Sequence, residues 1–174
     1  MTRAVFLAVL VAVAAGCAAD PYPLLTPAGA SDWVPTAIGR SVRGVVLYLE
    51  PRPGDRIELV SAEALGVGPE AGAKVYFSPP VHGGDGSVTI GETLGPVPGA
   101  TAGVDAGTSP GPGNEVGLVV ELTPTVAGTY AVSGVRVSFR VNGGPVETKE
   151  GVSMDFTACA DDPVPSSCGP TPGG

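Results

Sequence analysis

Short runs of alternating apolar and polar residues follow one another along most of the chain, separated by Gly, Pro, Asn and Asp. Such runs, rich in β-branched and aromatic residues, are typical of strands. In residues 42–50, for example, Val45, Leu47 and Leu49 fall on one face. No window after residue 20 has a convincing helical period, and residues 62–65 are expected to form one helical turn at most. The pattern predicts about seven strands, at residues 42–50, 56–60, 74–78, 87–90, 115–123, 129–141 and 146–158.

The run at residues 129–141 changes parity along its length. Tyr130 and Val132 have one parity, and the later apolar residues, Val135, Val137, Phe139 and Val141, have the other. Side chains of a strand alternate with a period of two, so a bulge or bend is predicted at Ser133-Gly134. Asn142-Gly143-Gly144 follows, and Asn-Gly is a strong hairpin signal. The sequence therefore predicts antiparallel pairing between this run and residues 146–158.

Gly128 and Tyr130 open the same run with a Gly-x-Tyr step. This step resembles the tyrosine corner of immunoglobulin-like sandwiches. The cystine that joins the sheets of antibody domains has no counterpart, and Trp33 precedes the first predicted strand. The predicted fold class is therefore all-β: an antiparallel immunoglobulin-like β-sandwich of about seven strands, not an antibody-type domain or a closed barrel.

The first residues have a different pattern. Arg3 and the amino terminus carry the only positive charges, and residues 4–15 are entirely apolar. This run is shorter than the roughly 20 apolar residues that span a bilayer. It is typical of the apolar segment of a secretion signal. The segment ends in three small residues followed by Cys17.

The tetrapeptide Ala14-Ala15-Gly16-Cys17 resembles the lipobox of bacterial lipoproteins, with Ala14 where that family usually has Leu. The resemblance implies cleavage before Cys17, a thioether-linked diacylglycerol on its sulfur and often an acylated new amino terminus. Two acyl chains hold a protein stably at a membrane, whereas one holds it only marginally. The alternatives are an ordinary signal peptide cut near Ala15 or Ala19, and a membrane helix.

A lipid on Cys17 would place the protein at the cell membrane, facing outside the cytoplasm. The whole sequence is expected to have four parts, of which the last two are a folded domain and a flexible Pro-rich tail. The parts are a signal peptide at residues 1–16, a Pro-rich tether at 17–35, the β-sandwich at 36–159 and the tail at 160–174.

Two segments lack a strand pattern. In the tether, Tyr22, Leu24 and Leu25 offer an alternative, a partly ordered arm that docks on the domain. Residues 94–114 are rich in Gly and Pro and match no strand. A loop of this length in a compact domain is usually functional or disordered, and its composition favours disorder or a mobile flap.

Charge and cysteine content narrow the range of partners. Removal of Arg3 with the signal leaves eight basic residues against 17 acidic ones, a formal charge of −9. Such a chain repels phosphate backbones, so nucleic acid is not expected as a partner. Cys159 and Cys168 remain as a pair, and an exported protein can join them as a disulfide. The rival interpretation, a metal site, lacks nearby His or further Cys ligands.

Motifs for catalysis are sparse. Residues 107–111 match the hydrolase motif G-x-S-x-G, but Pro110 follows the Ser and has no N–H for an oxyanion. The only histidine, His82, precedes that Ser, and the hydrolase order places it after. No catalytic residue is therefore assigned.

Other chemical groups also favour structural interpretations. His82 with Asp85 suits an exposed turn better than a metal site. Asp161-Asp162 suits a solvated turn, and Glu147 and Glu150 suit the polar face of a strand. No metal and no cofactor are expected.

The sequence thus predicts a membrane-anchored extracytoplasmic lipoprotein that carries a non-catalytic β-sandwich. Its partners are the membrane, through the lipid on Cys17, and an envelope protein or glycan of unknown identity. The alternative is an extracytoplasmic hydrolase whose carboxylates cannot be recognised from spacing. An aromatic content of 5% argues against a sugar-stacking cleft.

Overall fold

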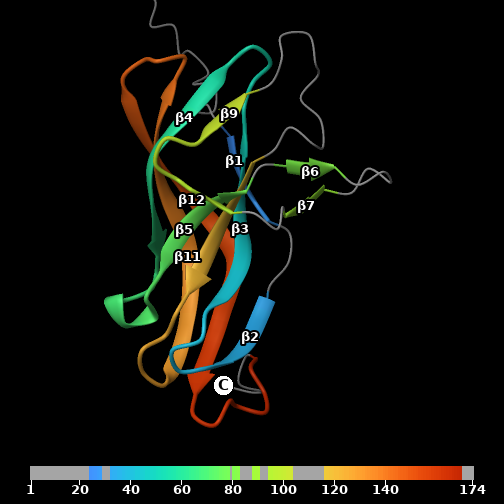
Figure 1. Cartoon of the computed structure of the whole chain (residues 1–174), viewed down its shortest axis with the longest axis vertical. Coiled ribbons are helices and arrows are strands. Elements are labelled where there is room, and N and C mark those ends of the chain that lie inside the picture. The colour runs from blue at the N-terminus through green and yellow to red at the C-terminus, as the bar shows by residue number, and fades with distance from the viewer. Residues whose placement is uncertain are drawn as a thin grey trace, which may run out of the picture.

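The computed structural model describes residues 24–28, 32–78, 80–82, 88–90, 94–103 and 116–169. Strands make up most of this part of the chain, and its one helical element is the 3₁₀ turn η1 (Pro69–Ala71). Two five-stranded sheets pack face to face (Figure 1). The fold is therefore an all-β sandwich, as the alternation predicts. Among the residues described, no helix has the length and apolar character needed to span a bilayer.

The first sheet has the order β1-β3-β10-β5-β8. Every neighbouring pair in it is antiparallel. Its central strand, β10, is buried along its whole length. The strands are β1 (Leu24–Pro27), β3 (Val42–Glu50), β10 (Val116–Leu122), β5 (Lys74–Ser78) and β8 (Gly95–Pro96).

The second sheet has the order β2-β12-β11-β4-β9. Its pairs are antiparallel except that β2 runs parallel to β12. A separate hairpin joins β6 (Pro80–His82) to β7 (Val88–Ile90). The strands of the second sheet are β2 (Asp32–Ala37), β12 (Val146–Asp161), β11 (Gly128–Val141), β4 (Arg56–Leu65) and β9 (Thr101–Gly103).

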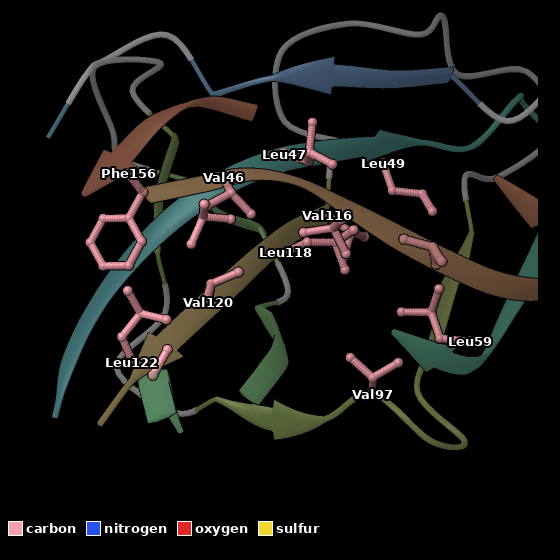
Figure 2. Packing of buried hydrophobic residues seen from close by; sticks show 14 of the residues in the cluster. Val46, Leu47, Leu49, Leu59, Val97, Val116, Leu118, Val120, Leu122 and Phe156 are labelled. Atoms are coloured by element: carbon pink, nitrogen blue, oxygen red, sulfur yellow. The ribbon is translucent and has the colours of Figure 1, made fainter. Parts of the chain in front are cut away.

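The hydrophobic core lies between the two sheets. In Figure 2, Leu47 and Leu118 of the first sheet and Leu59 and Phe156 of the second lie within one packed cluster. Each fully buried side chain of this size contributes roughly 1.5–3 kcal/mol. Val97, in the turn between β8 and β9, is also buried against this cluster.

The irregularity predicted at Ser133-Gly134 is confirmed. Val132 pairs with Phe156 and Gly134 pairs with Val152, so the register shifts between them. The extra residues lie on β12, where three residues face the single Ser133. This shift lets both apolar sets of β11 reach the core, and Tyr130, Val132, Val135, Val137 and Phe139 are all buried.

β3 contains a bulge that its sequence pattern does not reveal. Val45 and Leu47 pair with adjacent residues of β10, which leaves Val46 as an extra residue between them. Val46, Leu47 and Leu49 are buried, whereas Val45 is only partly buried. The prediction that Val45 shares a face with Leu47 and Leu49 was therefore wrong, because the bulge reverses the parity of the strand.

The hairpin predicted at Asn142-Gly143-Gly144 is confirmed. β11 and β12 pair antiparallel, and Asn142 and Gly143 have φ angles of 51° and 73°. Positive φ at both central residues is the requirement of a type I′ turn. The Gly144 N–H closes the turn by donating to Val141 O at 2.9 Å.

Several predicted boundaries differ from the structure. The predicted tether, residues 17–35, contains β1 and most of β2, and Trp33 lies within β2 rather than before the first strand. Leu25 packs against the core, as the docked-arm alternative expected. Pairing with β3 and β12 supplies the partners that a free tether would lack.

Two more segments carry strands that were not predicted. Residues 62–65 continue β4 instead of forming a helical turn, since they pair with β11. Residues 94–103 contain β8 and β9, and the rest of the predicted loop lies outside the described residues. β12 extends to Asp161, into the predicted tail.

The sandwich has two distinct ends. The hairpin end carries residues 51–55 and 142–145 and lies beside Leu24, which pairs with Glu50. The cystine end carries residues 38–41, 66–73, 123–127 and 162–169. β11 runs for 14 residues between the two ends. At about 3.4 Å per residue, the ends are roughly 45 Å apart.

Candidate functional site

The predicted disulfide between Cys159 and Cys168 is present at the cystine end. It joins the last strand to the segment at residues 162–169, and the two Cα atoms are 5.8 Å apart. An open cavity of about 590 Å³ lies beside the cystine. Its lining comes from three segments: residues 127–129, residues 159–161, which include Asp161, and residues 165 and 167–169.

Exposed apolar side chains gather at the same end. In the described part of the chain, five large apolar residues are exposed, and three of them are Ile38, Val126 and Val164, at 38%, 52% and 46%. Each lies in a different loop of the cystine end. We call these three residues the apolar tip.

Hydrogen bonds hold these loops together. The Gly39 N–H donates to Pro124 O at 2.7 Å, which ties the loop of Ile38 to that of Val126. The Tyr130 hydroxyl donates to Val126 O at 2.9 Å. The backbone beside Val126 is therefore fixed from two sides.

Acidic residues border the apolar tip. Ala37 pairs with Asp161 in the parallel β2–β12 ladder, which places the exposed Asp161 and Asp162 beside the loop of Ile38. Glu70 O accepts from both the N–H and the hydroxyl of Thr125, so Glu70 adjoins the loop of Val126. Asp161 and Asp162 thus place carboxylates beside the loop of Ile38, whereas Glu70 contacts the loop of Val126 through its backbone carbonyl and has its carboxylate close to Gly68.

A second cluster lies on β3, β10 and β5. Glu121, 7% exposed, accepts from Arg43 at 2.6 Å and from the Tyr76 hydroxyl at 3.3 Å. The Arg43 guanidinium also lies 5.7 Å from the centre of the Tyr76 ring, within the range of a cation–π contact. Both Glu121 oxygens are engaged, which is typical of a structural ion pair and not of a free general base.

Glu150, on the predicted polar face of β12, forms an ion pair with Arg136 of the neighbouring strand β11. Arg136 donates to Glu150 at 2.7–2.8 Å and to Glu63 at 2.9 Å. The hydrogen bond to Glu150, its charge and the charge of Glu63 raise the pKa of Arg136 above its usual value. All three side chains are well exposed, so these pairs contribute little to stability.

The other residues singled out in the sequence have varied positions. The backbone of His82 pairs with Val88 at the end of β6. Asp161 ends β12, its Oδ1 accepts the N–H of the following Asp162 at 2.8 Å, and both residues are exposed. Within the described ranges, no three metal-ligating side chains come together. Cys17, Asp85 and the motif at residues 107–111 lie outside the described residues.

Sequence reasoning missed the apolar tip and the Arg43–Glu121 pair. Arg43 and Glu121 are 78 residues apart, and no local pattern links them. The tip residues stand singly in three turns, and a single apolar residue in a turn carries no sequence signal. No protein-family model matches this chain, and no curated protein is similar enough in sequence to count as a relative.

Proposed function

We propose that this protein is a lipid-anchored extracytoplasmic lipoprotein whose β-sandwich is a non-catalytic binding module of the cell envelope. The observation that carries the anchor is Cys17, placed after an apolar run and three small residues. The Cys159–Cys168 cystine supports the compartment, because disulfides persist in oxidising surroundings outside the cytoplasm.

We also propose that the sandwich is immunoglobulin-like. Strands in positions A, B, E and D of that fold form one sheet, and C, F and G form the other. β1, β3, β10 and β5 have the first order, and β4, β11 and β12 have the second. Tyr130, at the start of the strand in position F, bonds to a carbonyl four residues upstream, as a tyrosine corner does.

The position of the anchor supports a role for the cystine end. Cys17 precedes Leu24 by seven residues, which reach at most about 25 Å when extended. Leu24 lies at the hairpin end. A lipid on Cys17 would hold that end near the membrane, with the cystine end roughly 45 Å further out. The apolar tip would then be directed toward other envelope components.

Metabolic labelling tests the anchor. Cells of a bacterium that expresses the full chain are fed radiolabelled palmitate, and the protein is recovered in detergent. We expect label on the wild type and on the control Cys168→Ala, but not on Cys17→Ala. The intact mass of the wild type should correspond to loss of residues 1–16 and gain of acyl chains. An unlabelled wild type, or one that keeps residues 1–16, would contradict the proposal.

A further inference from the structure

We infer that the cystine end docks a partner protein whose surface presents apolar side chains surrounded by basic residues. The inference deepens the proposed function and rests on it for the direction in which this end points. Its evidence is the apolar tip, the charges around it and the cavity beside the cystine.

The apolar tip has the character of a docking surface. Its three residues make up most of the large exposed apolar side chains in the described part of the chain, and all lie at one end. Clustered exposed apolar residues with a polar border mark interaction sites, whereas scattered ones do not. The Gly39–Pro124 and Tyr130–Val126 hydrogen bonds fix two of the three loops before any partner arrives. A preformed surface loses less entropy on binding.

The charged side chains at the cystine end indicate which kind of partner surface would bind there. In the four loops and the strand ends beside them, the exposed acids are Asp161 and Asp162 next to the loop of Ile38 and Glu70 in the loop at residues 66–73, against the basic Arg40 and Lys74. This local excess of negative charge has the same sign as that of the whole chain. It repels anionic lipid and nucleic acid and attracts a protein surface that carries Lys or Arg.

The cavity beside the cystine fits one basic side chain. Ala127, Gly128 and the Cys168 side of the cystine line it with small and apolar atoms, and Asp161 lies in the same lining. The aliphatic part of a Lys or Arg can pack on such a wall while its charged group approaches the carboxylate. The cavity therefore favours the same class of partner as the acidic residues near the apolar tip.

Site-specific photo-crosslinking in intact cells tests the docking surface. A photoreactive phenylalanine replaces Ile38, Val126 or Val164 in the full-length protein. The matched controls are Val146, which is 46% exposed like Val164 but lies near the hairpin end, and Val152, which is 76% exposed in β12. We expect tip positions to crosslink at least five-fold more than either control. The crosslinked peptide of the partner should contain apolar residues flanked by Lys or Arg.

Charge reversal completes the test. The double substitution Asp161→Lys and Asp162→Lys should reduce crosslinking from Val126 at least five-fold, whereas Glu147→Lys near the hairpin end should leave it unchanged. The inference would be overturned if the tip gave no crosslinks, if Val146 crosslinked as strongly as the tip, or if charge reversal had no effect. Adducts only with lipid or only with a second copy of this chain would also overturn it. Palmitate labelling without tip crosslinks would support the lipid anchor and overturn the docking inference. Tip crosslinks without labelling would instead overturn only the anchor.

Discussion

Phe156 of β12 lies directly against Gly44 of β3, so that a Cβ atom on Gly44 would be 2.6 Å from Phe156 Cδ2. Phe156 is among the largest fully or nearly fully buried side chains. Its ring fits between two sheets because the facing residue has no side chain. The close approach of these two residues sets how near β3 and β12 can lie at this point.

We expect Gly44→Ala to destabilise the fold. The added methyl group would displace Phe156 from its position in the core, and overpacking of this kind costs about 1–3 kcal/mol. The midpoint and slope of urea unfolding, followed by fluorescence, measure the change. Gly169→Ala is the control, since a Cβ there would meet nothing within 4 Å. Equal stability of the two variants would contradict the packing seen at Phe156.

The alternation of residues predicts strands well where one face is buried. The bounds of β3 and β5 match the predicted runs, and the parity change of β11 locates its irregularity. The bulge in β3 could not be predicted from the sequence, because Val45 and Val46 are both apolar and either could face the core. The second half of β4 was not predicted as a strand, because Ala62 and Ala64 are small and only half-buried and give a weak alternation.

Other features depend on pairing between distant segments. β1 and β2 look like a Pro-rich tether because nothing local shows that β3 and β12 offer them free edges. The cystine could be predicted because exactly two cysteines remain after Cys17 is set aside. The apolar tip could not, because only the folded chain brings its three loops to one end.

Arg43→Met should destabilise the protein by about 1–3 kcal/mol, because the nearly buried Glu121 carboxylate would lose its charged partner. Within the described part of the chain, the Tyr76 hydroxyl would then be the one remaining side-chain donor to that carboxylate. The double variant Arg43→Met with Glu121→Leu should recover most of the loss, since it removes the unpaired charge as well. A double-mutant cycle of unfolding free energies measures this coupling. Additive losses would indicate that the pair does not interact in solution.

Removal of the cystine should lower stability by about 2–3 kcal/mol, the loop-closure value for a short loop. Cys159→Ser with Cys168→Ser is compared with the wild type by thermal unfolding, each with and without dithiothreitol. The reductant should lower the Tm of the wild type and leave that of the double variant unchanged. Amide exchange at residues 162–169 should also become faster in the double variant. A wild type that is insensitive to dithiothreitol would contradict a solvent-accessible structural disulfide.

Asn142 combines a backbone role and a side-chain role, and two substitutions separate them. Its side chain accepts the Arg56 N–H at 2.8 Å and donates to Asp55 Oδ1 at 2.6 Å, which ties the β11–β12 hairpin to the start of β4. Its φ of 51° lies in the left-handed region, which glycine adopts freely and alanine does not. Asn142→Gly should therefore lose only the two hydrogen bonds, about 1–2 kcal/mol in all.

Asn142→Ala should cost about 1 kcal/mol more than Asn142→Gly, because the backbone strain is added to the same loss of hydrogen bonds. Asn142→Asp keeps an acceptor for the Arg56 N–H but places a second carboxylate against Asp55, so its loss should be greater at neutral pH, where carboxyl groups are ionised, than at a pH low enough to protonate them. Urea unfolding of the three variants at two pH values gives the order. If Asn142→Gly were the least stable of the three, the left-handed turn would not be what limits the choice of residue at this position.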